Sequence, residues 1–329
     1  MSHRLRQHVV LAGLILTAAL GALWIGPELI SPLAAWEDAS VRREILEASA
    51  PRACAALAVG AALGAAGALL QALLRNPLAD PALLGLSGGA ALGGAGVLTL
   101  AGGAELARGI ALPVPLAAFA GTAVCMLLLW RFGRVRGVVR LSAVVLAGVG
   151  VNALVGALIG LLMAFSDDQA LRDTTFWLFG TLTRADWPSL LPLAIAVPLA
   201  ILVAEVRATA LDQYQLGDRE ARQIGLGVGS LRWLGLGLAC LLTALAVAVA
   251  GIVGFVGLIV PYLARTLSGP EHGGRILDSA LFGALLLLLA DVGARTLVAP
   301  AEIPIGLITA LLGAPFFLLA LRRELGREP

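Results

Sequence analysis

Residue types that usually carry chemistry are scarce in this 329-residue chain. All 23 basic residues are arginine, because the sequence contains no lysine. This excludes a lysine Schiff base, and it also excludes a phosphate-binding loop that relies on a conserved lysine. Any nucleotide hydrolysis that serves this protein must therefore take place on another chain.

The three cysteines and three histidines form no redox or metal-binding pattern. Each cysteine stands alone in an apolar run without C-x-x-C spacing, so we predict buried free thiols at Cys54, Cys125 and Cys240. His3 and His8 lie in the N-terminal tail, and His272 lies in a polar loop. We therefore predict no metal site and no catalytic residue in this chain.

The composition indicates an integral membrane protein, so helices that cross the membrane must position the few candidate functional side chains. Hydrophobic residues make up 59% and charged residues 13% of the chain, and the mean hydropathy is +0.94. A crossing helix needs about 20 mostly apolar residues. This criterion predicts ten spans: Val9–Gly26, Pro51–Leu74, Leu83–Ala101, Ala111–Trp130, Leu141–Phe165, Ser189–Ala204, Leu231–Ile252, Val253–Leu267, Ile276–Ala299 and Pro304–Leu321.

The distribution of arginine decides between ten spans and nine. Ala244–Leu263 is almost continuously apolar and could form one helix instead of parts of two. With ten spans and a cytoplasmic N-terminus, most arginines, including those of loop 131–140 and tail 322–327, lie on the cytoplasmic side. We therefore predict a single transmembrane domain over residues 1–329, with both termini cytoplasmic. The net charge of +2 gives no indication of nucleic-acid binding.

Glycines recur within the predicted spans at a spacing that allows helices to approach closely. Small residues four apart let two helix backbones pack where lipid provides no hydrophobic drive. Three such pairs are Gly60 and Gly64, Gly85 and Gly89, and Gly156 and Gly160.

The most distinctive stretch is RNPLADPALLGLSGGAALG, which begins at Arg75. Pro77 and Pro81 cannot continue a helix, so the second span must end near Arg75. This stretch resembles the signature of FecCD-type permeases, the membrane subunits of ABC importers for heme, ferric siderophores and cobalamin. Segments in the same order as in that family are Leu216–Arg232, Ala250–Arg265 and Ala301–Leu318.

The resemblance implies an all-α integral membrane protein with the type II ABC importer permease fold. It further implies a homodimer with the pore between its two copies, in the bacterial inner membrane. The partners would be two cytoplasmic ATPase subunits, which bind ATP and Mg, and a periplasmic substrate-binding protein. We expect heme as the cargo, with a ferric siderophore or cobalamin as the alternative; an ion-coupled secondary transporter is the alternative outside this class. The chain itself would bind no cofactor and would not be an enzyme.

A cytoplasmic segment, Glu205–Ser230, is the candidate for contact with the ATPase. We expect Asp218 to cap a short helix that stops at Gly225, with Ala221 and Ile224 on one apolar face. The resemblance implies that this is the coupling helix. Its predicted contact residues are Asp218, Arg219, Ala221, Arg222, Ile224 and Gly225.

Two arginines at the opposite side of the membrane are candidates for docking the binding protein. Arg52 begins the second span and Arg295 ends the ninth. The resemblance implies that both meet glutamates of the binding protein, whereas a simple pair with Asp291 is the alternative for Arg295. Ser49 stands where relatives carry another arginine, and whether Arg42 or Arg43 replaces it stays open. The sequence therefore does not decide which of these arginines form the docking surface.

The resemblance also implies a cytoplasmic gate. Its residues would be Asn76, Leu78, Leu141 and Ser142, for which ordinary helix-end structure is the alternative. Tyr262 stands where relatives often carry histidine. Tyr262 and Met163 are the main side chains within the spans that could ligate iron, and we expect heme to pass without axial ligation.

Overall fold

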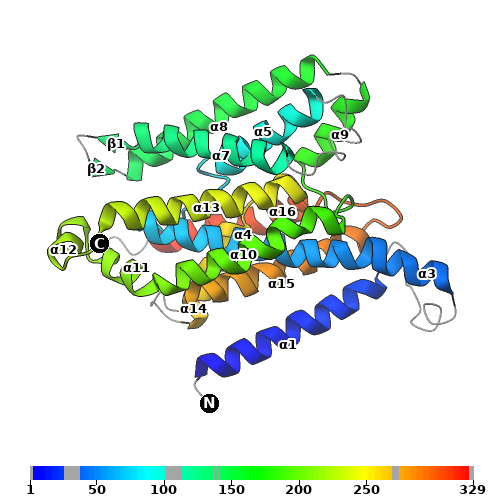
Figure 1. Cartoon of the computed structure of the whole chain (residues 1–329), viewed down its shortest axis with the longest axis horizontal. Coiled ribbons are helices and arrows are strands. Elements are labelled where there is room, and N and C mark those ends of the chain that lie inside the picture. Colours follow the sequence, from blue (N-terminus) through cyan, green and yellow to red (C-terminus); the bar gives the residue numbers. More distant parts are fainter. Residues whose placement is uncertain are drawn as a thin grey trace.

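The apolar runs of the sequence form long helices in the structure, which is a computed structural model (Figure 1). The structure describes residues 3–25, 38–100, 113–135, 138–139, 141–166, 168–268 and 274–325. The helices that correspond to the ten predicted spans are α1 (His3–Trp24), α4 (Ala50–Leu74), α5 (Leu86–Leu100), α7 (Pro113–Phe132), α8 (Leu141–Ala164), α10 (Trp187–Val206), α13 (Val228–Ala250), α14 (Val256–Ser268), α15 (Arg275–Thr296) and α16 (Ile305–Leu325).

The doubtful division between the seventh and eighth spans is real. Within the described residues, eight helices are long and apolar enough to cross a membrane, and α5 and α14 are the shorter apolar pair. Between α13 and α14 the backbone turns through positive φ angles, +68° at Gly251 and +65° at Phe255. Since L-residues rarely adopt such angles and never propagate them as a helix, a continuous helix through this region is excluded.

Helix α4 lies at the centre and packs against α10, α13, α14 and α15 (Figure 1). A Cβ atom added at Gly60 would lie 2.2 Å from the Gly283 carbonyl oxygen, and one at Gly64 would lie 2.2 Å from that of Ser279. These contacts are possible only for glycine. The predicted close packing at this pair is therefore confirmed, and the partner helix is α15.

A second layer of three helices, α5, α7 and α8, covers one side of the molecule (Figure 1). Gly89 packs against the backbone of Gly121 in α7, and Gly85 faces Val151 in α8. Gly156 and Gly160 of α8 have no atom within 4 Å of an added Cβ. This third pair therefore packs against no helix in the described part of this chain, and close packing there stays a prediction that would need a second copy.

The polar segments between spans form short helices and one hairpin. These elements are α3 (Ala39–Glu44), a π-helix (Ile45–Ser49), α9 (Asp168–Leu178), α11 (Ala208–Gln215), α12 (Asp218–Gln223) and the antiparallel strands β1 (Arg134–Val135) and β2 (Val138–Val139). In Figure 1, α12 and the hairpin lie at one end of the molecule, here named the α12 end. Helix α3 lies at the opposite end, the α3 end.

The cysteines are free thiols, but the prediction that all three are buried is wrong. Cys125 and Cys240 are buried, whereas Cys54 is exposed. Cys54 lies on the outward side of α4, one helical turn from the partly exposed Leu57 and Ala58. An apolar run alone cannot show which side of a helix faces its neighbours, and this is why the prediction failed for Cys54.

Candidate functional site

Helix α4 carries an arginine at each end, and each arginine belongs to a polar cluster. Arg52 lies in the first turn of α4 at the α3 end, and Arg75 caps the helix at the α12 end. The first cluster, here the Arg52 cluster, consists of Arg52, Asp291, Arg295 and Glu302. The second, here the Arg75 cluster, consists of Arg75, Tyr214, Asp218 and Arg232.

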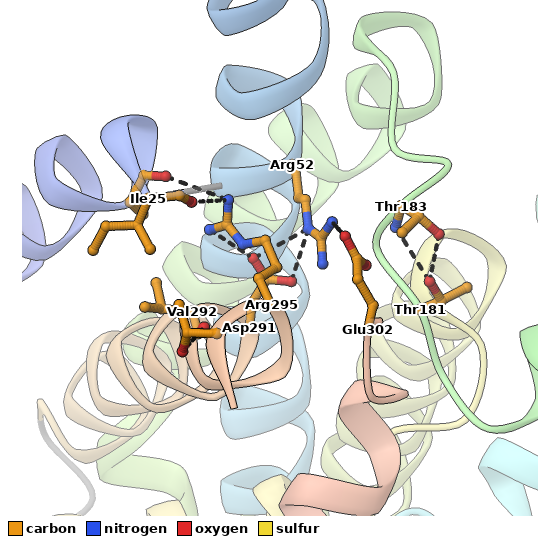
Figure 2. A network of polar contacts seen from close by, with 10 residues as sticks. Ile25, Arg52, Thr181, Thr183, Asp291, Val292, Arg295 and Glu302 are labelled. Carbon is orange, nitrogen blue, oxygen red and sulfur yellow. Dashed lines mark hydrogen bonds and ion pairs between the residues drawn. The ribbon is translucent and has the colours of Figure 1, made fainter. Parts of the chain in front are cut away.

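The Arg52 cluster joins α4 to α15 and to the segment before α16 (Figure 2). Nε of Arg52 donates to Oδ1 of Asp291 at 3.0 Å, and Nη1 donates to Oε1 of Glu302 at 2.9 Å. The side chains of Arg52 and Asp291 are only 12% and 1% exposed. Charges this deeply covered require partners, and these residues supply them to one another.

Arg295 is also part of this covered network. Its Nη1 donates to the Ile25 carbonyl at 2.8 Å, and its Nη2 lies 3.1 Å from Oδ2 of Asp291, an ion-pair distance without hydrogen-bond geometry. The Arg295 side chain is 3% exposed, so it offers no surface for docking in this structure. In this structure Arg295 ties the end of α1 to α15, and its pair with Asp291, the alternative reading, is present; its docking role stays a prediction.

A cavity of about 310 Å³ lies beside Arg52. Its polar lining comes from Arg52, Thr181, Thr183, Arg184, Asp291 and Glu302. The sequence analysis did not identify Glu302 as a candidate, although this residue lies in the segment Ala301–Leu318 that resembles the family. The signal was an acidic residue in an otherwise apolar motif.

Two further arginines at the α3 end are accessible. Arg42 and Arg43 are exposed on α3, and Nε of Arg43 lies 3.9 Å from a carboxylate oxygen of Glu47. This is an exposed pair of small energetic value. Both arginines therefore remain candidates to replace the arginine that relatives carry at the position of Ser49.

The Arg75 cluster ties α4 to α11, α12 and α13. Nη2 of Arg75 donates to Oδ1 of Asp218 at 2.9 Å, and Nε donates to the Tyr214 carbonyl at 3.0 Å. The Arg75 guanidinium lies 4.0 Å from the centre of the Tyr214 ring. From the other side, Arg232 donates to the Tyr214 hydroxyl at 2.6 Å and to both carboxylate oxygens of Asp218. Asp218 thus bridges two guanidinium groups.

The environment fixes the charge state of this cluster at neutral pH. Burial raises the pKa of Asp218, but the guanidiniums of Arg232 and Arg75 outweigh it and hold that pKa below 3.8. Burial raises the pKa of Tyr214 above 10, against the opposing effect of Arg232. Asp218 is therefore a charged acceptor and Tyr214 a neutral phenol.

The predicted short helix exists, with two corrections. Gly217, at φ +125°, is its N-cap, so Asp218 is the first helical residue and does not cap the helix. The carboxylate that could have capped it is engaged by two arginines instead. Gly225 has φ +83°, as a left-handed helix stop requires, and the predicted end is confirmed.

The predicted apolar face of α12 is wrong. Ala221 is fully buried, whereas Ile224 is 55% exposed. The helix is only six residues long, and Ile224 is its C-cap, with φ −83° and ψ 9°, so it has left the helical path. Ala221 cannot contact another chain here. The exposed residues among those predicted for coupling are Arg219, Arg222, Ile224 and Gly225.

The predicted gate residues lie directly after Arg75 and at the start of α8. Oδ1 of Asn76 accepts from the Leu78 N–H at 3.0 Å, and the Asn76 carbonyl accepts from the Ala79 N–H at 3.2 Å, which closes a turn. Leu141 and Ser142 begin α8, and the structure does not describe their side chains. The gate assignment therefore stays a prediction.

The same turn contains a buried carboxylate. Oδ1 of Asp80 accepts from the N–H groups of Ala82 and Leu83, and Asp80 is 2% exposed. Burial raises the pKa of Asp80 to about 6, against the two N–H groups that lower it.

The side chains considered for iron have ordinary neighbours. Tyr262 packs edge-on against Phe316, with ring centres 5.3 Å apart, and the Arg265 guanidinium lies 5.4 Å from its ring. Met163 is partly buried. Among the described residues, no group of three or more His, Cys, Asp or Glu side chains could hold a metal ion, and His272 lies outside these residues.

Comparison with known proteins covers nearly the whole chain. A family model described as the FecCD transport family matches residues 9–323. The hemin transport system permease protein HmuU of Yersinia pestis is 41% identical, over 83% of this chain and 81% of its own length. The vitamin B12 import system permease protein BtuC of Vibrio cholerae is 37% identical, over 98% of each chain. A solved ABC transporter in an inward-facing conformation superposes with a TM-score of 0.83 at 32% identity, over 96% of this chain and 98% of that one.

Proposed function

The chain belongs to the FecCD transport family, and from that premise we propose that it carries heme across the inner membrane of a bacterium. Its relatives are permease subunits of importers, so this chain is a transport component, and ATP hydrolysis falls to partner subunits. The observation that carries heme as the cargo is the 41% identity to a hemin permease. A ferric siderophore or cobalamin is the second candidate, since a vitamin B12 permease is 37% identical.

The distribution of arginine supports an assignment of the two ends of the molecule to the two sides of the membrane. We assign the α12 end to the cytoplasm, together with both termini, because most arginines of the loops then lie inside. The α3 end, with Arg52 and the cavity beside it, then faces the periplasm and the binding protein. Arg52 remains the docking candidate, and a carboxylate of the binding protein would compete there with Glu302.

The pore would lie between two copies of this chain. Support comes from α8, whose Gly156 and Gly160 have no neighbour within 4 Å of an added Cβ. Large apolar side chains of the same helix are exposed, among them Leu146 at 73% and Leu161 at 56%. We expect this face of α8 either to pack against α8 of a second copy or to line the pore.

Coupling to the ATPase would use the exposed part of α12. Ile224 is an exposed apolar side chain that directly follows the exposed polar residues Arg219, Arg222 and Gln223. This is the composition expected of a small docking surface with an apolar centre and a polar rim. ATP-driven displacement of α12 would then alternate the opening of the pore.

An ion-coupled transporter is the competing class. Such a protein would place an available ionisable group within the membrane. Asp291, the candidate within a span, is held by Arg52 and Arg295. Uptake by this chain alone, driven by a proton gradient without any ATPase, would contradict the importer assignment.

Cargo is tested with the reconstituted complex of this chain, its ATPase and its binding protein. We expect ATP hydrolysis to rise when the binding protein is loaded with heme. Stimulation by a siderophore-loaded or cobalamin-loaded binding protein, with none by the heme-loaded one, would reverse the order of cargoes.

Coupling is tested by Ile224→Asp, which places a charge at the centre of the docking surface. We expect transport to be lost while the permease dimer stays intact on size-exclusion chromatography. Gln213→Asp, which adds the same charge at an exposed position of α11, is the matched control and should transport normally. Normal transport by Ile224→Asp would remove the coupling assignment.

A further inference from the structure

We infer that Arg75 is a positioning residue that links the coupling helix to the cytoplasmic gate. Its side chain holds α12 through Asp218, and its main chain ends α4 and begins the gate turn. The inference rests on the proposed coupling role of α12 and on the predicted gate at Asn76 and Leu78, and it adds the route by which motion passes from one to the other.

The main chain of Arg75 is in an unusual conformation. Its φ is +50°, and the following N–H, that of Asn76, donates to the Gln71 carbonyl at 3.1 Å. This is the left-handed helix stop at which glycine is usual, because a Cβ atom is disfavoured there. An arginine at this position indicates that its side chain has a task that glycine could not perform.

The side chain fixes the position of α11 and α12 relative to α4. Besides the contact with Asp218, the Arg75 guanidinium stacks on the ring of Tyr214, a residue that is 2% exposed. A second tie runs beside it, since Nε2 of Gln215 donates to the Ala72 carbonyl at 3.0 Å. While these contacts are intact, a displacement of α11 and α12 is passed to the last turn of α4.

The route from Arg75 to the gate is a single peptide bond. Asn76 comes next, and its side chain closes the turn that carries Leu78. No flexible segment intervenes between the charged contact at Asp218 and this turn. A shift of α12 that moves Asp218 must therefore either move the gate turn or break the contact with Arg75.

The variant Arg75→Gly tests the side-chain contact with Asp218 separately from the main-chain conformation that ends α4. Glycine keeps the left-handed conformation that ends α4, so the turn persists, but the contact with Asp218 is lost. In the reconstituted complex we expect cargo transported per ATP hydrolysed to fall about tenfold, a typical strength of coupling between sites. ATP hydrolysis stimulated by the binding protein should stay within about twofold of the parent, since the surface that docks the ATPase is untouched. Asp218→Asn should lower the same ratio.

The double variant tests whether Arg75 and Asp218 act as one link. If they do, Arg75→Gly combined with Asp218→Asn lowers the cargo-to-ATP ratio no further than the more severe single variant. Arg75→Lys, which keeps the charge opposite Asp218, should restore part of the ratio. Arg207→Gln removes an exposed arginine at the junction of α10 and α11 and is the charge-matched control, with an unchanged ratio expected.

Several results would overturn the link. One is an unchanged ratio of cargo to ATP in Arg75→Gly. Another is a double variant whose loss in this ratio is the product of the two single losses. The third is failure of Arg75→Gly to assemble with the ATPase, which would show a purely structural role. Ile224→Asp in the same assay separates this proposal from the one it rests on. If Ile224→Asp is inactive but Arg75→Gly is fully coupled, only the link fails; if Ile224→Asp transports normally, the coupling role of α12 itself fails.

Discussion

The two ends of α4 use the same chemistry in different surroundings. At the α3 end, Arg52 and Asp291 form a pair that is 12% and 1% exposed, and Arg295 adds a second covered guanidinium. At the α12 end, Arg75 and Asp218 are 31% and 33% exposed, and Arg232 is the second guanidinium. The first cluster is shielded from water, whereas in the second water reaches Arg75 and Asp218 and can replace the contact between them; Arg232, at 11% exposed, is covered like Arg52.

This difference suits the different tasks proposed for the two ends. A buried ion pair costs several kcal/mol to break by removing one partner, whereas an exposed pair contributes about 1 kcal/mol or less. Between the two clusters, α4 packs on the backbone of α15 through Gly60 and Gly64. The Arg52 end is therefore built to hold its geometry, and the Arg75 end can exchange contacts during a transport cycle.

The largest effect is expected from removing the carboxylate of the Arg52 cluster. Asp291→Ala leaves the guanidiniums of Arg52 and Arg295 covered without their shared counter-charge. We expect the free energy of unfolding in detergent to fall by about 3–5 kcal/mol. Denaturant titration followed by tryptophan fluorescence measures this loss. Asp218→Ala is the comparison at the other end, and an equal loss in both variants would contradict the distinction between them.

The spans could be predicted because membrane crossing imposes a simple rule on the sequence. Long apolar runs, Pro77 and Pro81 after α4, and the arginine distribution were sufficient to place ten helices in order. Even the break between α13 and α14 followed from charge placement, although the local hydropathy is nearly continuous. The glycine stop at Gly225 was equally readable, since its conformation is a local property.

Side-chain partners could not be predicted, because they come from distant parts of the chain. Arg52 and Asp291 are 239 positions apart, and Arg75 and Asp218 are 143 apart. Arg295 was expected at the surface, but the Ile25 carbonyl and Asp291 satisfy it in the interior. Ala221 and Ile224 were expected on one face, but a six-residue helix ends before that periodicity applies. The sequence pattern identified the candidate site residues, but the packing of the helices determines which of their side chains are accessible.

A third carboxylate sharpens the comparison, because Asp80 is buried near the Arg75 end and held by backbone N–H groups. Its pKa is raised from 3.8 to about 6, so the charged form is disfavoured in the folded chain. Stability should therefore fall as pH rises from about 4 to about 6, with the full penalty above that range. Asp80→Asn keeps an acceptor for Ala82 and Leu83 and should stabilise the chain by up to about 3 kcal/mol at pH 7.5.

The pH dependence of that gain is the decisive measurement for Asp80. Thermal unfolding of the parent and Asp80→Asn proteins should differ at pH 7.5 and converge below about pH 4, where both side chains are uncharged. Asp80→Ala, which removes the acceptor as well, is the control and should not gain. A parent protein that is more stable than Asp80→Asn at pH 7.5 would show that the charge is favourable in this turn.

The smallest effect is expected at Asp218, where the sign is opposite to that at Asp80. The pKa of Asp218 is lowered, because its two guanidiniums outweigh burial. Its contribution is therefore present above the unfolded value near 3.8 and is lost as pH falls below it. Since a third of the side chain is exposed, Asp218→Asn should cost about 1 kcal/mol or less at pH 7.

The gap in unfolding temperature between parent and variant should narrow in 1 M salt and below about pH 4, because screening and protonation both weaken the pair. The corresponding gap for Asp291→Ala should persist in salt. Salt sensitivity at the Arg52 end, or its absence at the Arg75 end, would break the contrast between a shielded and an exchangeable cluster.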